Sequence, residues 1–148
     1  RLLMRFAHTT RLPLVSIARL LAILLGAGTS AELFAQDLKS GEQVYKETCF
    51  ACHASGVEKA PKFGDRQAWE PLIKEGQHVL TAHAWVGVRR MPARGGKADL
   101  SLEEFARAAA YMARAAGGDW KDPDAALLNR IRAEEKKRIE HLKSKQDQ

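Results

Sequence analysis

The sequence has little cysteine, no convincing strand pattern and no long apolar run. Cys49 and Cys52 are its only cysteines, so no third thiol competes with this pair. No stretch after the N-terminal segment alternates apolar and polar residues as a half-buried strand would, which excludes a sheet-based fold. No basic stripe carries interleaved aromatics, so the excess of 24 Lys and Arg over 18 Asp and Glu does not indicate nucleic-acid binding.

The first 35 residues predict a signal peptide. Basic residues up to Arg19 precede an apolar run, and small residues follow it. Cleavage after Ala31 or Ala35 would release an exported, periplasmic protein. Arg19 interrupts the apolar stretch, which falls short of the ~20 residues of a membrane span. An uncleaved signal that anchors the protein is the open alternative.

Five consecutive residues carry the strongest signal: Cys49-Phe50-Ala51-Cys52-His53. C-x-x-C-H is the attachment signature of c-type haem. Thiols at this spacing reach the two vinyl groups of one porphyrin, and the imidazole that follows meets the iron from the same face. The sequence therefore predicts one haem c, covalently attached through Cys49 and Cys52, with His53 as an iron ligand.

Three other interpretations of the two cysteines are open. A C-x-x-C redox centre normally belongs to a βαβ pattern, and no strand precedes Cys49. A zinc site could join the cysteines to His78 and His83, but the intervening gap is about twice the roughly 12–15 residues of the usual finger, and His53 would be left without a role. A disulfide between Cys49 and Cys52 would close a small, strained loop.

The remaining site residues come from three segments. A haem-bound histidine needs an acceptor for its other ring nitrogen, and we expect the Pro61 carbonyl to supply it. Trp69 is expected in the core and the haem wall. Met91 lies in a Pro/Gly loop that suits a second axial ligand, whereas Met112 lies in a predicted helix. His78 and His83 are the minor candidates for that ligand.

Helices are predicted over residues 38–50, 65–74, 77–87 and from Ser101 to the Gly117-Gly118 pair. Ser40 with Gln43, and Ser101 with Glu104, form possible capping boxes. Gly41 is costly inside a helix, and close approach of a second helix would explain it.

A last, charged segment begins at Asp122-Pro123, with Asp122 as the predicted cap and Pro123 at the first helical position. We expect a solvated helical tail there, with i,i+4 pairs such as Glu134–Arg138, or alternatively a docking or oligomerisation helix.

The stretch from Asp37 to Ala116 resembles the class I c-type cytochromes, and the bacterial cytochrome c5 type in particular. The similarity rests on C-x-x-C-H, on Gly41 and Tyr45 at eight and four residues before Cys49, and on the Ala60-Pro61-Lys62 and Met91–Gly96 loops. It implies an all-α class I cytochrome c fold, with Tyr111 of the last core helix against Gly41. The extra cysteine pair of many c5 proteins is replaced here by Lys97 and Leu100.

These features predict three parts: a signal peptide at 1–35, a cytochrome c domain at 36–118 and a charged helical tail at 119–148. The expected function is periplasmic one-electron transport by a haem iron held between His53 and Met91, without enzymatic activity. One alternative is a haem subunit docked on a partner dehydrogenase. Another is a displaceable Met91 that opens the iron to peroxide or a small gas.

The expected partners are redox proteins, either an oxidase or a dehydrogenase, and no nucleic acid. Contact with the membrane would be transient or through an uncleaved signal. The chain is expected to be a monomer or a weak dimer.

Overall fold

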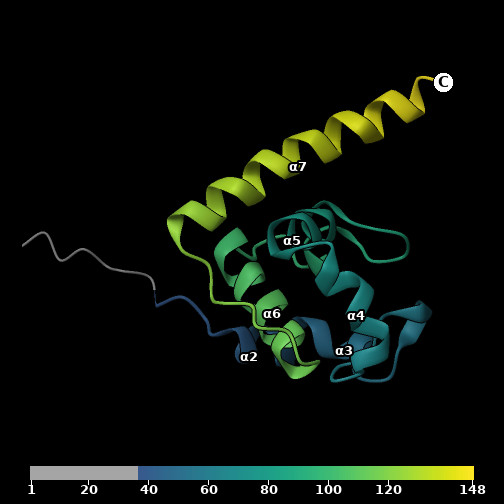
Figure 1. The fold of residues 1–148 in the computed structure, drawn as a ribbon. Helices are drawn as coiled ribbons and strands as arrows, with labels where there is room; N and C mark the ends of the chain where they lie inside the picture. Colours follow the sequence, from purple (N-terminus) through teal and green to yellow (C-terminus); the bar gives the residue numbers. More distant parts are fainter. Residues whose placement is uncertain (1–36) are drawn as a thin grey trace, which may run out of the picture. The chain divides into compact units, whose positions relative to one another are not determined.

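Helices and turns make up residues 37–148, the part of the chain that the structure describes (Figure 1). The computed structural model contains no strand within this range, apart from an isolated backbone pairing between Val88 and Met91. The predicted all-α fold is therefore confirmed. The predicted signal peptide, residues 1–35, lies outside the described residues.

The first helical run delivers the Cys-x-x-Cys-His motif. It consists of α2 (Gly41–Val44), a π-helical stretch (Tyr45–Cys49) and α3 (Phe50–His53). The predicted capping box is present, since Ser40 and Gln43 each hydrogen-bond the other's backbone N–H. π-Helical turns are rare and occur frequently at functional sites. Here the turn ends at Cys49, the first residue of the motif.

Helix α6 (Leu102–Ala115) crosses α2 at Gly41. A Cβ atom at Gly41 would lie 2.2 Å from the carbonyl oxygen of Arg107 and 3.0 Å from Cβ of Tyr111. The ring of Tyr45 lies 5.7 Å from that of Tyr111. The predicted close approach is thus confirmed, because only glycine leaves room for the backbone of the second helix.

Two shorter helices complete the wall around the motif. Helix α4 (Arg66–Lys74) is capped by Asp65, whose carboxylate accepts a hydrogen bond from the N–H of Ala68, 3.1 Å away. Helix α5 (Gln77–Val86) follows directly and ends at Gly87, whose φ of 103° suits glycine. Both helices match the predicted ranges to within a residue or so at each end.

The charged C-terminal segment forms α7 (Ala125–Gln146). The predicted cap, Asp122, and the predicted first helical residue, Pro123, are both wrong. The cap of α7 is Asp124, whose carboxylate accepts a hydrogen bond from the N–H of Leu127 at 2.7 Å, so Pro123 precedes the helix. Asp122, the predicted cap, instead pairs with Arg114 at 3.0 Å.

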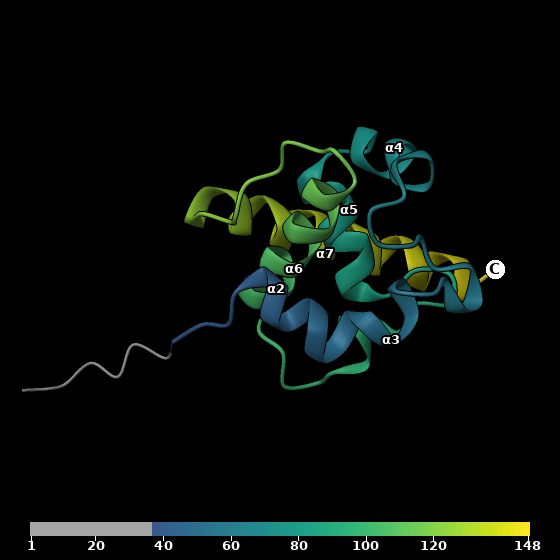
Figure 2. The same cartoon turned by 90° about the horizontal axis from the view of Figure 1, so that it is seen from below.

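The first turns of α7 are also not solvated. Leu127, Leu128 and Ile131 are buried in a second apolar cluster with Ala82 of α5 and Ala106 of α6. Figures 1 and 2 show α7 running alongside α5 in both views. The tail therefore covers one side of the helical unit over part of its length.

Candidate haem site

A cavity of about 750 Å³ lies among α3, α4, α5, α6 and the loops that join them. This volume is within the roughly 300–1,000 Å³ of ordinary cofactor pockets. Its wall is largely apolar and includes Leu72, Leu80, Ala84, Phe105 and Ala109. All six residues that the sequence singled out line this one cavity: Cys49, Cys52, His53, Pro61, Trp69 and Met91.

His53 is held in a defined orientation. Its Nδ1 atom lies 2.9 Å from the carbonyl oxygen of Pro61, the acceptor chosen from the sequence. A carbonyl can only accept, so Nδ1 carries the hydrogen and Nε2 keeps its lone pair free. The ring is buried, and the backbone N–H of Phe63 donates to the His53 carbonyl at 2.7 Å. This arrangement is what a metal-binding imidazole requires.

Trp69 fixes the loop that supplies this acceptor. Its indole Nε1 donates to the carbonyl oxygen of Lys62, 2.9 Å away, and its side chain is 3% exposed. Lys62 is the next residue after Pro61, so the indole indirectly sets the direction of the His53 ring. Trp69 therefore combines the expected core position with a hydrogen bond that the sequence did not reveal.

The two cysteines differ in their surroundings. Cys49 is buried and Cys52 is exposed, and they form no disulfide. Burial, assisted by the neighbouring Cys52, raises the pKa of Cys49 to about 11. A thiol with so high a pKa carries little thiolate at neutral pH, and thiolate is what disulfide exchange requires. The redox interpretation also lacks its βαβ setting, because residues 37–148 contain no strand before the motif.

The zinc interpretation also lacks support. His83 lines the cavity together with the cysteines, but His78 is not among the lining residues. Within residues 37–148, no group of three or more His, Cys, Asp or Glu side chains is arranged to hold a metal ion.

Met91 enters the cavity from a tight loop. Its backbone N–H donates to the Val88 carbonyl at 2.9 Å, and the N–H of Val88 donates back at 3.1 Å. A Cβ atom on the preceding Gly87 would lie 3.1 Å from the Ala93 nitrogen, so the loop is closely packed as well as hydrogen-bonded. The thioether is thus carried by a backbone with few alternative positions.

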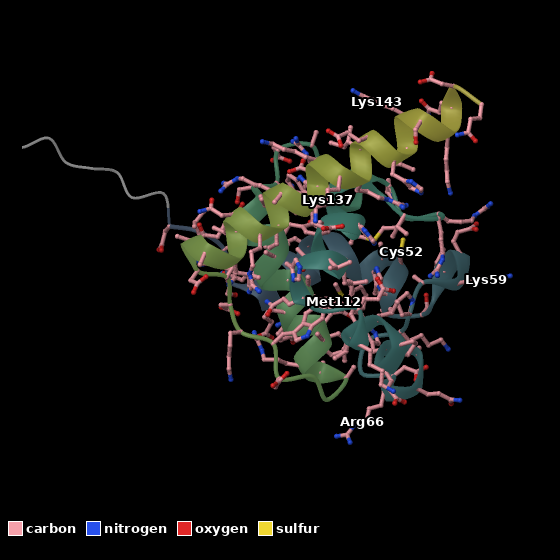
Figure 3. All side chains as sticks on the ribbon, turned by 45° about the horizontal axis from the view of Figure 1, so that its top comes forward. Cys52, Lys59, Arg66, Met112, Lys137 and Lys143 are labelled. Carbon is pink, nitrogen blue, oxygen red and sulfur yellow. The ribbon has the colours of Figure 1, made fainter. Side chains whose placement is uncertain are left out.

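Met112 also lines the cavity, from α6, and is buried (Figure 3). Because Met112 lies in a predicted helix, the sequence favours Met91 over it as the second iron ligand. The helical position does not keep its side chain out of the cavity. Met112 is packed within the main apolar cluster, whereas Met91 only borders it. This cluster includes Val44, Trp69, Trp85, Phe105 and Ala113. His83, a minor candidate for the second ligand, also lines the cavity. Its Nδ1 lies 3.9 Å from Glu75 and its Nε2 lies 3.8 Å from Glu134.

The lining of the cavity fits a group that is mostly apolar and partly anionic. Within the described part of the chain, neither the Thr48 hydroxyl nor Nε of Arg138 has a hydrogen-bond partner. Both residues line the cavity. Both atoms are covered by the protein itself, so the fit rests on the lining as a whole, which is largely apolar and includes four Lys or Arg side chains against two Glu. A haem, apolar over its ring and anionic at its propionates, fits this wall.

Arg138 is a cavity residue that sequence reasoning missed. It was expected to pair with Glu134 on the solvated face of a tail. In the structure Glu134 pairs with Lys137 at 3.1 Å instead, and Arg138 reaches the cavity. No motif in the sequence could have indicated this, because it depends on where α7 packs.

Comparison with known proteins agrees with this site. Residues 36–112 match the family described as "Cytochrome C oxidase, cbb3-type, subunit III". The chain is 38% identical over 97 residues to cytochrome c-555 of Chlorobaculum tepidum, covering 62% of this chain and 90% of that protein. It is 38% identical over 76 residues to cytochrome c5 of Azotobacter vinelandii, covering 50% of this chain and 92% of that protein.

A solved structure is similar as well. A chain in the structure titled "Crystal structure of electron transfer complex of nitrite reductase with cytochrome c" shares 46% identity and a TM-score of 0.50. The match covers 51% of this chain and 93% of that one. The chain belongs to the class I c-type cytochromes. It resembles their c5 type, has their fold, and carries one haem c attached through Cys49 and Cys52.

This cytochrome holds its last loop without the cysteine pair of many c5 proteins. Lys97 and Leu100 occupy those positions. Leu100 is 4% exposed within the main apolar cluster, and its backbone N–H donates to the Lys97 carbonyl at 3.2 Å. At these two positions a buried leucine and a local turn therefore stand in place of a disulfide bond. Family membership places this cytochrome among the haem-iron proteins of electron transport.

Proposed function

We propose that this cytochrome is an exported, periplasmic one-electron carrier whose haem iron is held by His53 and Met91. The observation that carries the proposal is the hydrogen bond from His53 Nδ1 to the Pro61 carbonyl, which leaves Nε2 free to ligate. Met91 offers a thioether to the same cavity from a backbone fixed by two hydrogen bonds.

The haem, when bound, supplies the one-electron exchange between ferrous and ferric iron. The chain's own residues set the conditions for it. A thioether ligand favours the ferrous state and raises the potential. Pro61 and Trp69 hold the imidazole in one orientation, so little rearrangement is needed when the charge on the iron changes. With His53 and Met91 both ligating, no position is left for a substrate, which supports electron transfer over catalysis.

Axial ligation can be tested by comparing two methionine variants of the haem-loaded protein. Met91→Ala should abolish the thioether–iron charge-transfer band of the oxidised spectrum, lower the potential and permit carbon monoxide binding. Met112→Ala should keep that band, because its sulfur would serve only as packing. A band that persists in Met91→Ala would overturn the assignment to Met91. Loss of the band in Met112→Ala alone would transfer the ligand role to α6.

The alternative of a haem subunit docked through its C-terminal helix receives less support. Leu127, Leu128 and Ile131 are already buried against the chain's own α5 and α6. Their apolar surface is therefore not available to a dehydrogenase. We propose that the chain works as a monomer or weak dimer and meets an oxidase or dehydrogenase transiently.

The periplasmic location rests on the predicted signal peptide. Among the described residues, no helix is long and apolar enough to cross a membrane. N-terminal sequencing of the haem-loaded protein from a periplasmic fraction should find a start at Glu32 or Gln36. A start upstream of Arg19 would indicate a retained anchor instead.

A further inference from the structure

The C-terminal helix contributes a cation to the haem cavity. Arg138 lies two turns beyond the buried Ile131 and lines the cavity. The family match covers residues 36–112 and therefore does not include α7. Lys137 and Lys143, labelled in Figure 3, mark the stretch of α7 around Arg138. Three contacts seat this stretch: the buried apolar residues, the bond from Trp85 Nε1 to Glu135 at 3.0 Å, and Glu134 beside His83.

The guanidinium has no acceptor among the described residues. Its Nε is buried and makes no hydrogen bond there. Of the two acids that line the cavity, Glu58 is paired with Arg90, and Glu75 lies beside His83, with 3.9 Å between its carboxylate and Nδ1. Glu134, one turn earlier on α7, pairs with Lys137. Arg138 therefore lines the cavity as a cation with no ion pair among the described residues.

The charge of the wall indicates what kind of acceptor the cavity suits. The lining residues include four Lys or Arg side chains and two Glu, a net charge of +2: Lys59, Arg89, Arg90, Arg138, Glu58 and Glu75. A haem carries two propionate carboxylates, whose combined charge of −2 would balance the +2 of the lining. Guanidinium and carboxylate form the strongest charge-assisted hydrogen bonds in proteins. Of the four cations, only Arg138 is not exposed, so its charge is the least screened by solvent.

We propose that α7 is a built-in cover of the haem cavity, and that Arg138 is a positioning residue that binds a haem propionate. A partly buried cation at this place disfavours the ferric state, which carries one more positive charge than the ferrous state. Arg138 should therefore raise the reduction potential. The inference rests on the covalent haem and does not depend on Met91 as a ligand or on the redox partner.

The test is potentiometry on the haem-loaded full chain, with a matched control. Arg138→Gln should lower the potential by an amount that changes the ferrous-to-ferric ratio about tenfold at fixed ambient potential, or about 59 mV for one electron. Arg138→Lys should retain most of the wild-type potential, because it keeps the charge. Lys137→Gln removes the same charge from the neighbouring residue, whose side chain is 72% exposed, and should leave the potential almost unchanged.

Two results would overturn the proposal. Equal potentials in wild type and Arg138→Gln would show that the guanidinium does not interact with the haem. Equal shifts in Arg138→Gln and Lys137→Gln would show that only the net charge of α7 matters. The charge-transfer band, measured on the same samples, reports the axial ligand separately. A loss of the proposed ligation can thus be distinguished from a loss of the propionate contact.

Discussion

Helices α6 and α7 both pack against an earlier helix, but they do so in opposite ways. Helix α6 meets α2 by backbone, with the Arg107 carbonyl lying where a side chain of Gly41 would be. Helix α7 meets α5 by side chains, with Ile131 fully buried beside Ala82. Each contact also has one carboxylate that crosses it. Glu104 of α6 accepts from the Lys39 N–H at 3.2 Å, and Glu135 of α7 accepts from Trp85 at 3.0 Å.

The difference explains which contact could be seen in the sequence. A backbone contact needs a glycine within a helix, where that residue is otherwise unfavourable, so Gly41 was conspicuous. A side-chain contact uses ordinary leucines and isoleucines, which occur on many helices. The apolar stripe of α7 was visible, but the stripe alone did not say whether it faces solvent, a partner or the chain itself.

The largest expected effect is at the side-chain contact. Ile131→Ala would remove a fully buried side chain from between α7 and α5 and leave a cavity. Such truncations cost about 2–5 kcal/mol, so the free energy of unfolding should fall by that amount. Denaturant unfolding of the haem-loaded protein measures it.

The control for Ile131 lies two turns further along the same helix. Ile139 is only half-buried, so Ile139→Ala should cost clearly less. Equal and small losses in the two variants would mean that α7 does not pack on α5 as described.

The backbone contact should be the next most sensitive. Gly41→Ala would place a Cβ atom 2.2 Å from the Arg107 carbonyl, so α2 and α6 must separate. Overpacking a tight site costs typically about 1–3 kcal/mol, which should outweigh the ~1 kcal/mol that alanine gains in helix propensity. Equilibrium unfolding should show lower stability than wild type. An increase would show that the crossing has room for a methyl group.

How much the sequence could predict follows from the same distinction. Local features were predictable because their signals are local: both capping boxes, the ranges of α4 and α5, and the Pro61 carbonyl beside His53. The first helical run, predicted over 38–50, covers 41–53 instead. The cavity contributions of Met112 and Arg138 depend on how distant helices pack, which no short motif encodes. The cap of α7 was wrong for a similar reason, because Asp122 is occupied by Arg114 of another helix.

The polar bond at the α5–α7 contact is expected to contribute less than the apolar one. Glu135→Ala and Trp85→Phe, combined in a double-mutant cycle, should show a coupling free energy of about 1 kcal/mol. Phenylalanine at position 85 retains the edge-to-face contact with Phe105, whose ring lies 5.3 Å away. The coupling free energy, rather than either single variant, reports the hydrogen bond, because the Trp85 ring also lies beneath the guanidinium of Arg94, 4.7 Å away. A coupling near zero would mean that water replaces Glu135 as the acceptor.

The smallest effect concerns the carboxylate at the α2–α6 contact, and it should depend on pH. Hydrogen bonds from the Ser101 hydroxyl, and then from the Lys39 backbone, lower the pKa of Glu104 below its ordinary value of 4.5. The folded state thus favours the ionised form. Its stabilising contribution is present above pH 4.5 and is lost as the pH falls through the lowered pKa. Glu104→Gln can keep the capping geometry but cannot ionise. The stability difference between wild type and this variant, measured by denaturant unfolding from pH 7 downward, should be constant at first and then shrink in acid. A difference that does not shrink anywhere in the acid range over which the protein stays folded would show that the charge of Glu104 does not contribute to the crossing.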